Sequence, residues 1–324
     1  MINACIVGCG AISAVHAEVL SNLKSVKLYA VCDIDKSRAD KAAERYNAKA
    51  YYDFCECLND ENIDVIHICT PHYLHYEMSC KALEHGKKVV VEKPAVMTKE
   101  ELEKIFAEYN VENIYPIVQN RKNICIEELK RIVKSDKTLG KPIGVKGILT
   151  WSRSAEYYNS ADWRGKKATE GGGVLINQAV HTLDLMMYFM GAAKEVSASM
   201  HNSSLQNVIE VEDTIDAYIK YESGATGIFY ATNAYCKNTS AQLEFEFENR
   251  SFKYCDGVLI SNGEIICSDT REFKGKDYWG NGHAKALYDY YENKESFSLA
   301  DVKDTMNAMF AIYESAQNGK SVIV

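Results

Sequence analysis

The first part of the chain alternates short apolar runs with stretches of helical period. Residues Asn3 to Val7 form an apolar run that predicts a buried strand, and apolar positions at helical spacing follow from Val15 to Leu23. Further apolar runs predict strands at Lys27–Cys32, Tyr51–Tyr52, Ile63–Thr70, Lys88–Glu92 and Ile114–Gln119, with helices at Lys36–Tyr46, Leu74–Glu84 and Lys99–Tyr109 between them. Strands that alternate with helices of about ten residues predict a doubly wound parallel sheet.

The pattern changes after Arg121. A helix at Ile126–Lys134 and a strand at Ile143–Trp151 lead into a loop rich in aromatic and charged residues, Ser152–Glu170. Gly171 to Gly173 then open a strongly apolar helix that runs to Met190. Alternating segments predict strands at 195–201, 213–221, 225–233, 242–248, 250–254 and 257–261, with helices at 283–293 and 299–318. The turn Glu222–Gly224 is the clearest hairpin.

These patterns predict an α/β protein of two domains. Residues 1–121 are expected to form a Rossmann domain with a doubly wound parallel sheet. Residues 122–324 are expected to form an α+β domain around a large, mainly antiparallel open sheet, with the C-terminal helix packing back on the first domain. Alternating Ala217, Ile219 and Tyr221, with Ile228 and Tyr230, leave one sheet face that either meets another subunit or is covered by the C-terminal helices.

In a parallel sheet the functional loops lie at the carboxyl ends of the strands. Here those ends carry Gly8–Ser13, Asp33, Thr70–His75, Glu92–Pro94 and Gln119–Arg121.

The first of these loops has the residues of a dinucleotide-binding turn. Gly8 allows a tight turn out of the strand, and Gly10 lets a pyrophosphate lie close to the backbone. The helix that begins near Ala11 and Ile12 directs its unpaired N–H groups at that phosphate. Asp33 ends the second strand, where a carboxylate accepts hydrogen bonds from the adenosine ribose and repels a 2′-phosphate. We therefore expect NAD rather than NADP, the alternative being a similar sheet that binds nothing.

Composition and charge exclude several classes of protein. The 324 residues carry a net charge of −8 with no basic run, which disfavours nucleic acid as a partner. No apolar stretch has the length of a membrane span, and the chain enters a strand at once without the basic start of a signal peptide. The eleven cysteines lack the spacing of a zinc site, so we expect no metal and a reduced, cytoplasmic protein.

Several of these motifs together resemble the glucose–fructose oxidoreductase / inositol dehydrogenase (Gfo/Idh/MocA) family. They are Gly8-x-Gly10, Asp33, Thr70-Pro71-His72-Tyr73-Leu74-His75, Glu92-Lys93-Pro94, Trp163-Arg164, Gly171-Gly172-Gly173, His181-Thr182-Leu183-Asp184 and the tail Ile312–Lys320. The resemblance covers nearly the whole chain. It implies an NAD(P)-dependent sugar or polyol dehydrogenase or reductase whose open sheet serves oligomerisation, as a homodimer or homotetramer.

Two residues are the candidates for catalysis. Lys93 follows a buried strand, and an ammonium in a partly desolvated cleft can polarise a carbonyl oxygen and relay a proton. The family's lysine at this position has that role. His181 is the second candidate, and with Asn177 it is expected to lie on one face of the glycine-initiated helix. Relatives often carry aspartate where this chain has Asn177, so the sequence leaves open whether Lys93 or His181 takes the proton.

The remaining candidates line the predicted pocket. Arg121, Tyr158 and Arg164 join Asn177 as expected substrate contacts, and Trp163 is expected to reach over the cofactor. Thr70, Pro71, His75 and Glu92 are expected to contact the cofactor, although a solvated His75 and a purely packing role for Trp163 stay open. Asp184 is expected to be a structural hydrogen-bond acceptor, and His283 has no assigned role.

Two rival functions remain. An NAD-retaining enzyme that eliminates a glycosidic bond by transient oxidation fits the same residues, and so does a regulator that senses NAD(P) without catalysis. The lysine and histidine argue against the regulator.

Overall fold

The computed structural model describes residues 1–269, 282–293 and 296–324, which group into two compact units. The first unit comprises Met1–Ile117 and His283–Val302, and the second comprises Val118–Gly282 and Lys303–Val324. Each unit is therefore built from two stretches of sequence. The predicted domains met at residue 121, close to the first crossing. The stretch His283–Val302 returns to the first unit, and the C-terminal helix belongs to the second. The expected packing of that helix on the first domain stays a prediction.

The first unit contains a six-stranded parallel sheet in the order β3-β2-β1-β4-β5-β6. Its strands are β1 (Ile2–Val7), β2 (Val26–Cys32), β3 (Lys49–Tyr51), β4 (Val65–Ile68), β5 (Lys88–Val91) and β6 (Ile114–Pro116). Its helices include α1 (Ser13–Asn22), α2 (Lys36–Tyr46), α3 (Phe54–Asn59), α4 (His75–Glu84), α5 (Lys99–Glu108) and α10 (Gly282–Tyr288), which the π-helix η6 (Asp289–Asn293) continues. The strand order reverses between β1 and β4, which is the switch point where such sheets bind ligands. The predicted doubly wound sheet is confirmed.

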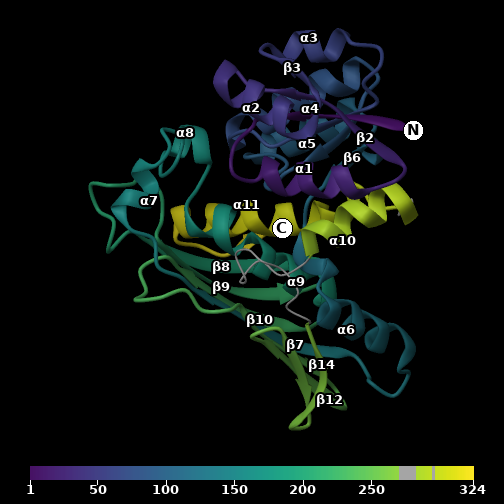
Figure 1. The fold of residues 1–324 in the computed structure, drawn as a ribbon. Helices are drawn as coiled ribbons and strands as arrows, with labels where there is room; N and C mark the ends of the chain where they lie inside the picture. The colour runs from purple at the N-terminus through teal and green to yellow at the C-terminus, as the bar shows by residue number, and fades with distance from the viewer. Residues whose placement is uncertain (270–281, 294–295) are drawn as a thin grey trace. The chain divides into compact units, whose positions relative to one another are not determined.

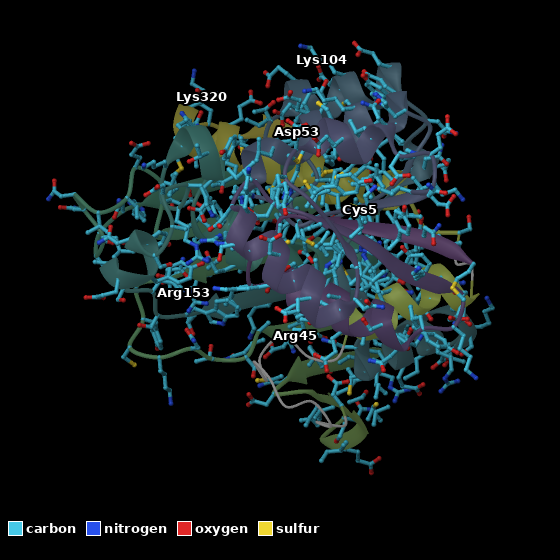
Figure 2. The ribbon with its side chains drawn as sticks, turned by 45° about the horizontal axis from the view of Figure 1, so that its top comes forward. Cys5, Arg45, Asp53, Lys104, Arg153 and Lys320 are labelled. Carbon is cyan, nitrogen blue, oxygen red and sulfur yellow. The ribbon has the colours of Figure 1, made fainter. Side chains whose placement is uncertain are left out.

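Local chemistry explains why these elements form where they do. All four residues of β4 are buried, as expected of a parallel strand that is covered on both faces. The Asp35 side chain accepts hydrogen bonds from the backbone N–H groups of Ser37 and Arg38, which begins α2 at Lys36. Cys5 in β1 is fully buried, whereas Arg45 on α2 is exposed (Figure 2). The elements that form the sheet thus follow the apolar pattern of the sequence closely.

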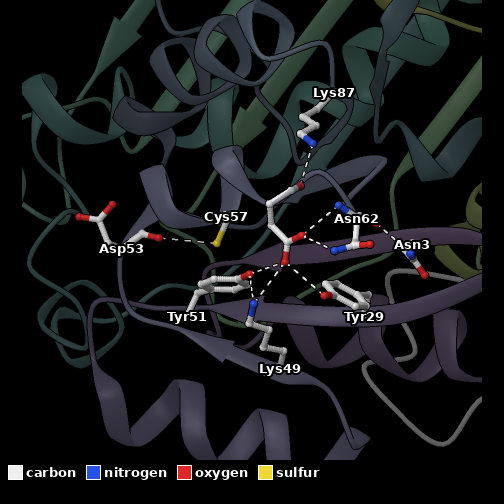
Figure 3. A network of polar contacts seen from close by, with 9 residues as sticks. Asn3, Tyr29, Lys49, Tyr51, Asp53, Cys57, Asn62 and Lys87 are labelled. Carbon is white, nitrogen blue, oxygen red and sulfur yellow. Dashed lines mark hydrogen bonds and ion pairs between the residues drawn. The ribbon is translucent and has the colours of Figure 1, made fainter.

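A polar network joins the loop before the amino end of β4 to strands β2 and β3. Asp60 is the central carboxylate, and it accepts hydrogen bonds from the hydroxyls of Tyr51 at 2.5 Å and Tyr29 at 3.2 Å (Figure 3). Lys49 Nζ lies 3.3 Å from the same oxygen, and the Asp60 side chain is 9% exposed. The hydrogen bond from the Tyr51 hydroxyl is the main reason why the pKa of Asp60 lies well below its usual range.

Replacing Asp60 by asparagine is expected to lower the free energy of unfolding at pH 7 by about 1–3 kcal/mol, since hydrogen bonds to a charged acceptor are lost. The pKa of Asp60 is depressed by folding, so its stabilisation is present above the unfolded pKa, about 3.9, and is lost as the pH falls further. Urea unfolding at a series of pH values should show the gap between the variant and the unaltered protein narrowing below about pH 4. The exposed neighbour in Glu61→Gln serves as the control, and an equally stable Asp60→Asn protein would contradict the assignment.

The second unit contains a nine-stranded sheet in the order β14-β13-β12-β11-β7-β10-β9-β8-β15. Its strands are β7 (Pro142–Thr150), β8 (Ala193–His201), β9 (Thr214–Tyr221), β10 (Thr226–Thr232), β11 (Gln242–Phe247), β12 (Arg250–Cys255), β13 (Val258–Ser261), β14 (Glu264–Ser268) and β15 (Val322–Ile323). The β7–β10 pair is parallel, and the other neighbouring strands of this sheet are antiparallel. The mainly antiparallel sheet and the hairpin between β9 and β10 are confirmed, while β14 and β15 were not predicted.

One face of this sheet is covered by helices of the same unit. These are α9 (Val180–Met190), which contacts β7, and α11 (Lys303–Asn318), which contacts β8 and α9 (Figure 1). Ala217, Ile219 and Tyr221 of β9 are buried on the covered face. The opposite face presents Tyr218 of β9 beside Ile228 of β10, which are 43% and 58% exposed. The open face therefore carries Tyr218 and Ile228. Of the two alternatives left by the sequence, cover by helices is the one that holds for Ala217, Ile219 and Tyr221.

The cysteines and the helices bear on the expected class of the protein. All eleven cysteines are free, and five of the buried ones, Cys5, Cys32, Cys57, Cys69 and Cys80, lie in the first unit. Across the ranges that the structure describes, no helix combines the length and apolar character needed to cross a bilayer.

Candidate active site

The glycine turn after β1 has the shape that a pyrophosphate site needs. Gly8 has φ +91°, and a Cβ added there would lie 2.8 Å from the backbone of Cys69, so only glycine fits. A Cβ added at Gly10 would meet no atom within 4 Å, so space is open beside that residue. Helix α1 begins at Ser13, whose hydroxyl donates to the Gly10 carbonyl at 2.6 Å. The residues present therefore fit a phosphate at the start of α1.

Asp33 fixes the turn as well as ending β2. One carboxylate oxygen accepts from the backbone N–H of Cys9 at 2.7 Å, and the other accepts from that of Asp35 at 2.8 Å. A carboxylate oxygen has two lone-pair sites, so each keeps one for a ribose hydroxyl. The link between Asp33 and the glycine turn was not predicted from the sequence.

A cavity of about 230 Å³ lies beside this turn, between α1 and α2. Gly10, Ser13 and Ala17 line one side, and the exposed cations Arg38 and Lys41 line the other. Positive charge at this position favours an anionic ligand. Burial raises the pKa of the Cys9 thiol, which also lines the cavity, to about 12, so that thiol stays protonated at neutral pH.

The segment Glu92-Lys93-Pro94 follows β5 at the same edge of the sheet. Lys93 is half-buried, and the Lys93–Pro94 peptide bond is cis. Glu92 is 6% exposed, and its Oε1 accepts from His16 Nε2 at 3.0 Å and from His283 Nε2 at 3.2 Å. Burial alone would raise the pKa of Glu92, but these two hydrogen bonds outweigh it and hold the pKa well below its usual range. Glu92 is therefore a buried carboxylate.

The hydrogen bonds continue from His16 into the core. His16 Nδ1 lies 2.9 Å from His67 Nδ1, and His67 Nε2 lies 2.6 Å from the Tyr291 hydroxyl. His16 and His67 are fully buried, and Tyr291 is 2% exposed. Burial lowers the pKa of His67 well below its usual range, so this imidazole is neutral.

His75 joins the ends of β4 and β5. Its Nδ1 lies 2.7 Å from the Pro94 carbonyl oxygen, and its Nε2 lies 2.7 Å from that of Thr70. The side chain is 1% exposed, which rules out the solvated histidine left open by the sequence. His75 thus holds the loops that carry Thr70, Pro71 and Lys93, and its contact with a cofactor stays a prediction.

In the second unit, the glycine run lets the backbone approach a buried carboxylate. Glu212 accepts from the backbone N–H of Gly173 at 2.8 Å and of Leu175 at 3.1 Å, and from the Tyr313 hydroxyl at 2.9 Å. A Cβ added at Gly173 would lie 1.8 Å from the Glu212 carbonyl oxygen, so the close approach requires glycine there. Burial raises the pKa of the Glu212 carboxyl.

The helix that follows is irregular where the substrate residues were predicted. Residues Leu175–Ala179 form a π-helix, η4, and the α-helix begins only at Val180. Asn177 therefore lies in a π-turn and His181 in the first turn of α9, so four-residue spacing does not by itself place them on one face. The Asn177 amide donates to Glu170, a fully buried carboxylate, and His181 is 8% exposed.

Arg121 is paired within the second unit. Its guanidinium donates to both oxygens of Asp184, at 2.7 and 2.6 Å, and the Thr305 hydroxyl donates to the same carboxylate at 2.8 Å. Both Arg121 and Asp184 are buried. Asp184 is thus a hydrogen-bond acceptor, as predicted, and the bidentate pair gives Arg121 a structural role beside its predicted substrate contact.

In the aromatic loop, residues 152–170, the side chain of Arg164 binds other residues of the same loop. Arg164 donates to the Ser160 hydroxyl at 2.6 Å and to the Tyr157 carbonyl at 3.2 Å, and its guanidinium lies 4.3 Å from the centre of the Tyr157 ring. Trp163 is half-buried, with the Arg164 guanidinium 5.5 Å from its ring centre. Tyr158 is 3% exposed, and its hydroxyl accepts from the Asn233 amide at 3.0 Å. The ligand contacts assigned to these three residues stay predictions.

Sequence reasoning missed the polar residues that support the site. These are His16, His67, His283 and Tyr291 in the first unit and Glu170 and Glu212 in the second. One signal was available, because His67 interrupts the apolar strand Val65–Ile68 and a buried imidazole needs partners.

Comparison with known proteins agrees with this architecture. Residues 2–114 match the model of the oxidoreductase family with an NAD-binding Rossmann fold, and residues 126–253 match the C-terminal domain model of the GFO/IDH/MocA family. Together the two models cover well over half of the chain.

Three curated relatives are named sugar or inositol dehydrogenases. D-glucoside 3-dehydrogenase of Escherichia coli is 26% identical over 98% of this chain and 96% of its own length. scyllo-Inositol 2-dehydrogenase (NAD+) of Bacillus subtilis is 30% identical and levoglucosan dehydrogenase of Pseudarthrobacter phenanthrenivorans 25% identical, each over 68% of this chain. Those two alignments span 64% and 65% of the relatives' own lengths, slightly under two thirds.

Solved structures show the same fold along the whole chain. The WlbA dehydrogenase of Chromobacterium violaceum, solved with NADH and UDP-GlcNAcA, superposes with a TM-score of 0.84 at 27% identity, over 100% of this chain and 96% of that one. A levoglucosan dehydrogenase solved with NADH gives a TM-score of 0.86 at 22% identity, over 100% and 99%, which supports the fold alone. With both family models matched in order and the glycine turn, Asp33 and Lys93 at the same sheet edge, this chain belongs to the Gfo/Idh/MocA family of NAD-binding oxidoreductases.

Proposed function

We propose that this protein transfers hydride between NAD(H) and a secondary alcohol or ketone of a sugar, cyclic polyol or sugar derivative. The observation that carries the proposal is the half-buried Lys93 at the carboxyl end of β5, in a chain whose curated relatives include dehydrogenases named for inositols, glucosides and levoglucosan. A lysine held at this edge of the sheet stands where a Rossmann unit presents its cofactor.

The first unit supplies the residues that would hold the cofactor. The turn Gly8–Ile12 would bind the pyrophosphate, and Asp33 would accept hydrogen bonds from the adenosine ribose. Thr70, Pro71 and Glu92 lie at the ends of β4 and β5, on the side where the nicotinamide half would extend. NAD supplies the hydride acceptor, and NADH the donor.

We assign the transfer of the substrate's hydroxyl proton to Lys93 and His181. When the alcohol is oxidised, its hydroxyl proton must leave while the carbon loses hydride. A group whose pKa lies near the working pH transfers that proton best. Lys93 would hold the substrate oxygen and stabilise its developing negative charge. His181 would hydrogen-bond a sugar hydroxyl, and Asn177 can donate to and accept from a neighbouring one.

A direct assay tests the proposal. Purified protein is mixed with NAD+ and a panel of inositols, glucosides, anhydrosugars and nucleotide sugars, and NADH is followed by its absorbance. Net NADH formation with at least one of these classes is the expected result. Protein that binds NAD+ and oxidises none of them would overturn the substrate class while leaving the cofactor site standing.

Asp33→Asn is expected to raise the KM for NAD+ about tenfold, because hydrogen bonds to a charged acceptor are lost both in the glycine turn and at the ribose. The same change removes the charge that opposes a 2′-phosphate, so the ratio of kcat/KM for NAD+ to that for NADP+ should fall by at least as much. The exposed Asp40→Asn is the matched control on α2. If the ratio of kcat/KM for NAD+ to that for NADP+ is unaltered in Asp33→Asn, Asp33 does not select between the two cofactors.

We further propose that the protein is a cytoplasmic homo-oligomer that uses the open face of its nine-stranded sheet. Tyr218 and Ile228 are paired in register and expose apolar surface on that face. Eleven free cysteines suit a reducing compartment. Light scattering on the purified protein, and titration of its thiols without added reductant, test the two statements.

A further inference from the structure

The buried carboxylate of Glu92 accepts hydrogen bonds from His16 and His283, which favour its charged form. The chain Tyr291–His67–His16–Glu92 can be satisfied with every imidazole neutral. The Tyr291 hydroxyl then donates to His67 Nε2, His67 Nδ1–H donates to His16 Nδ1, and His16 Nε2–H donates to Glu92. His283 donates to the same oxygen from the other side. Every hydrogen bond in this arrangement points toward Glu92, and all of its members belong to the first unit.

This arrangement leaves one net negative charge in the interior. The alternative, with a protonated His16, would reverse the two inner hydrogen bonds and give a cluster with no net charge, because His16 would then donate from both ring nitrogens. The neutral His67 fits both arrangements. The two differ in charge, and that difference can be measured.

The order of strands places this charge on one side of the switch point. Asp33 follows β2, the glycine turn follows β1, and Glu92 follows β5, two positions beyond β1 in the order β2-β1-β4-β5. A dinucleotide with its pyrophosphate at the glycine turn and its adenosine ribose at Asp33 extends its other half toward β4 and β5. That half carries the nicotinamide ring, which is a cation in NAD+ and uncharged in NADH.

We propose that Glu92 is the counter-ion of the nicotinamide ring, so that the first unit favours oxidised over reduced cofactor, and that His16 and His283 are positioning residues that keep this carboxylate in place. The inference rests on the proposed NAD site. An anion close to the ring and shielded from water stabilises the oxidised form, since Coulomb interactions strengthen where solvent is excluded. Lys93, which carries the opposite charge, is the next residue along the chain.

The test is the ratio of two dissociation constants, Kd for NADH over Kd for NAD+, measured by calorimetry without substrate. Glu92→Gln keeps a carbonyl oxygen that can accept from both histidines and removes only the charge. This ratio is expected to fall about tenfold in Glu92→Gln and to stay within about twofold of the unaltered protein in Glu92→Asp, which keeps a carboxylate.

Asp60→Asn is the matched control, because it also turns a largely buried acid of the first unit into its amide. Asp60 precedes the amino end of β4, away from the carboxyl edge of the sheet. The ratio of Kd for NADH to Kd for NAD+ should therefore be unchanged in Asp60→Asn. A ratio unaltered in Glu92→Gln, with both cofactor forms still bound, overturns the proposal and indicates the uncharged cluster. Failure of the unaltered protein to bind either form would instead overturn the proposed cofactor site.

A second measurement needs no substitution. A dinucleotide in which carbon replaces the pyridinium nitrogen is planar like NAD+ but carries no ring charge. The unaltered protein is expected to bind NAD+ at least threefold more tightly than this analogue. Equal affinities would overturn the proposal even if Glu92→Gln does not fold.

Discussion

Lys93→Ala is expected to lower kcat for sugar or polyol oxidation by about 10²–10⁴-fold, the usual range for loss of a general acid–base group. The ammonium that would hold the substrate oxygen and stabilise its charge is removed. NAD+ should still bind, because the glycine turn and Asp33, which would bind the other parts of the cofactor, are unaltered. Stopped-flow measurement of NADH formation, together with calorimetry of NAD+ binding, separates the two effects.

Lys93→Arg tells whether the proton or the charge matters. An arginine keeps the positive charge but does not release a proton in proteins, so a variant as impaired as alanine would assign proton transfer to Lys93. Lys88→Ala is the matched control, since Lys88 is exposed at the start of the same strand, β5. Full turnover in Lys93→Ala would remove the lysine from the mechanism.

The sequence predicted best where structure is decided locally. Helix α2 begins at Lys36, as expected, because Asp35 satisfies two backbone N–H groups within three residues of itself. The strands of the first unit were found because buried parallel strands are largely apolar. Val65–Ile68 is apolar except at His67, and Lys88–Val91 is apolar after its first residue. A carboxyl-edge site follows directly from that alternation, which explains why Gly8, Asp33 and Lys93 could be named in advance.

What the sequence concealed depends on contacts between distant residues. Glu92 was expected to touch the cofactor, yet its partners lie 76 and 191 residues away, at His16 and His283. Nothing in the local pattern of either histidine identifies that carboxylate. Likewise the π-helix at Leu175–Ala179 forms where Gly173 and Leu175 are held by Glu212, 39 and 37 residues further on. Periodicity describes one element at a time, and so it cannot anticipate a polar group supplied by another.

His181→Gln is expected to lower kcat/KM for the sugar by about 10²–10⁴-fold while leaving NAD+ binding unchanged, because glutamine can hydrogen-bond a hydroxyl but cannot accept its proton. In the oxidation direction the accepting base must be unprotonated, so kcat/KM should rise with pH along a limb that His181 contributes. That limb should be absent from the pH profile of the variant. The exposed His201→Gln, also in the second unit, is the control.

Combining this change with Lys93→Ala decides whether the two groups act in one step. Groups that transfer the same proton lose their effect together, so the double variant should be little slower than the slower single one. If the losses multiply instead, the lysine and the histidine act in separate steps, and the assignment of both to one proton transfer fails. A pH limb that survives in His181→Gln but vanishes in Lys93→Arg would assign the proton to Lys93 and leave His181 to hold the sugar.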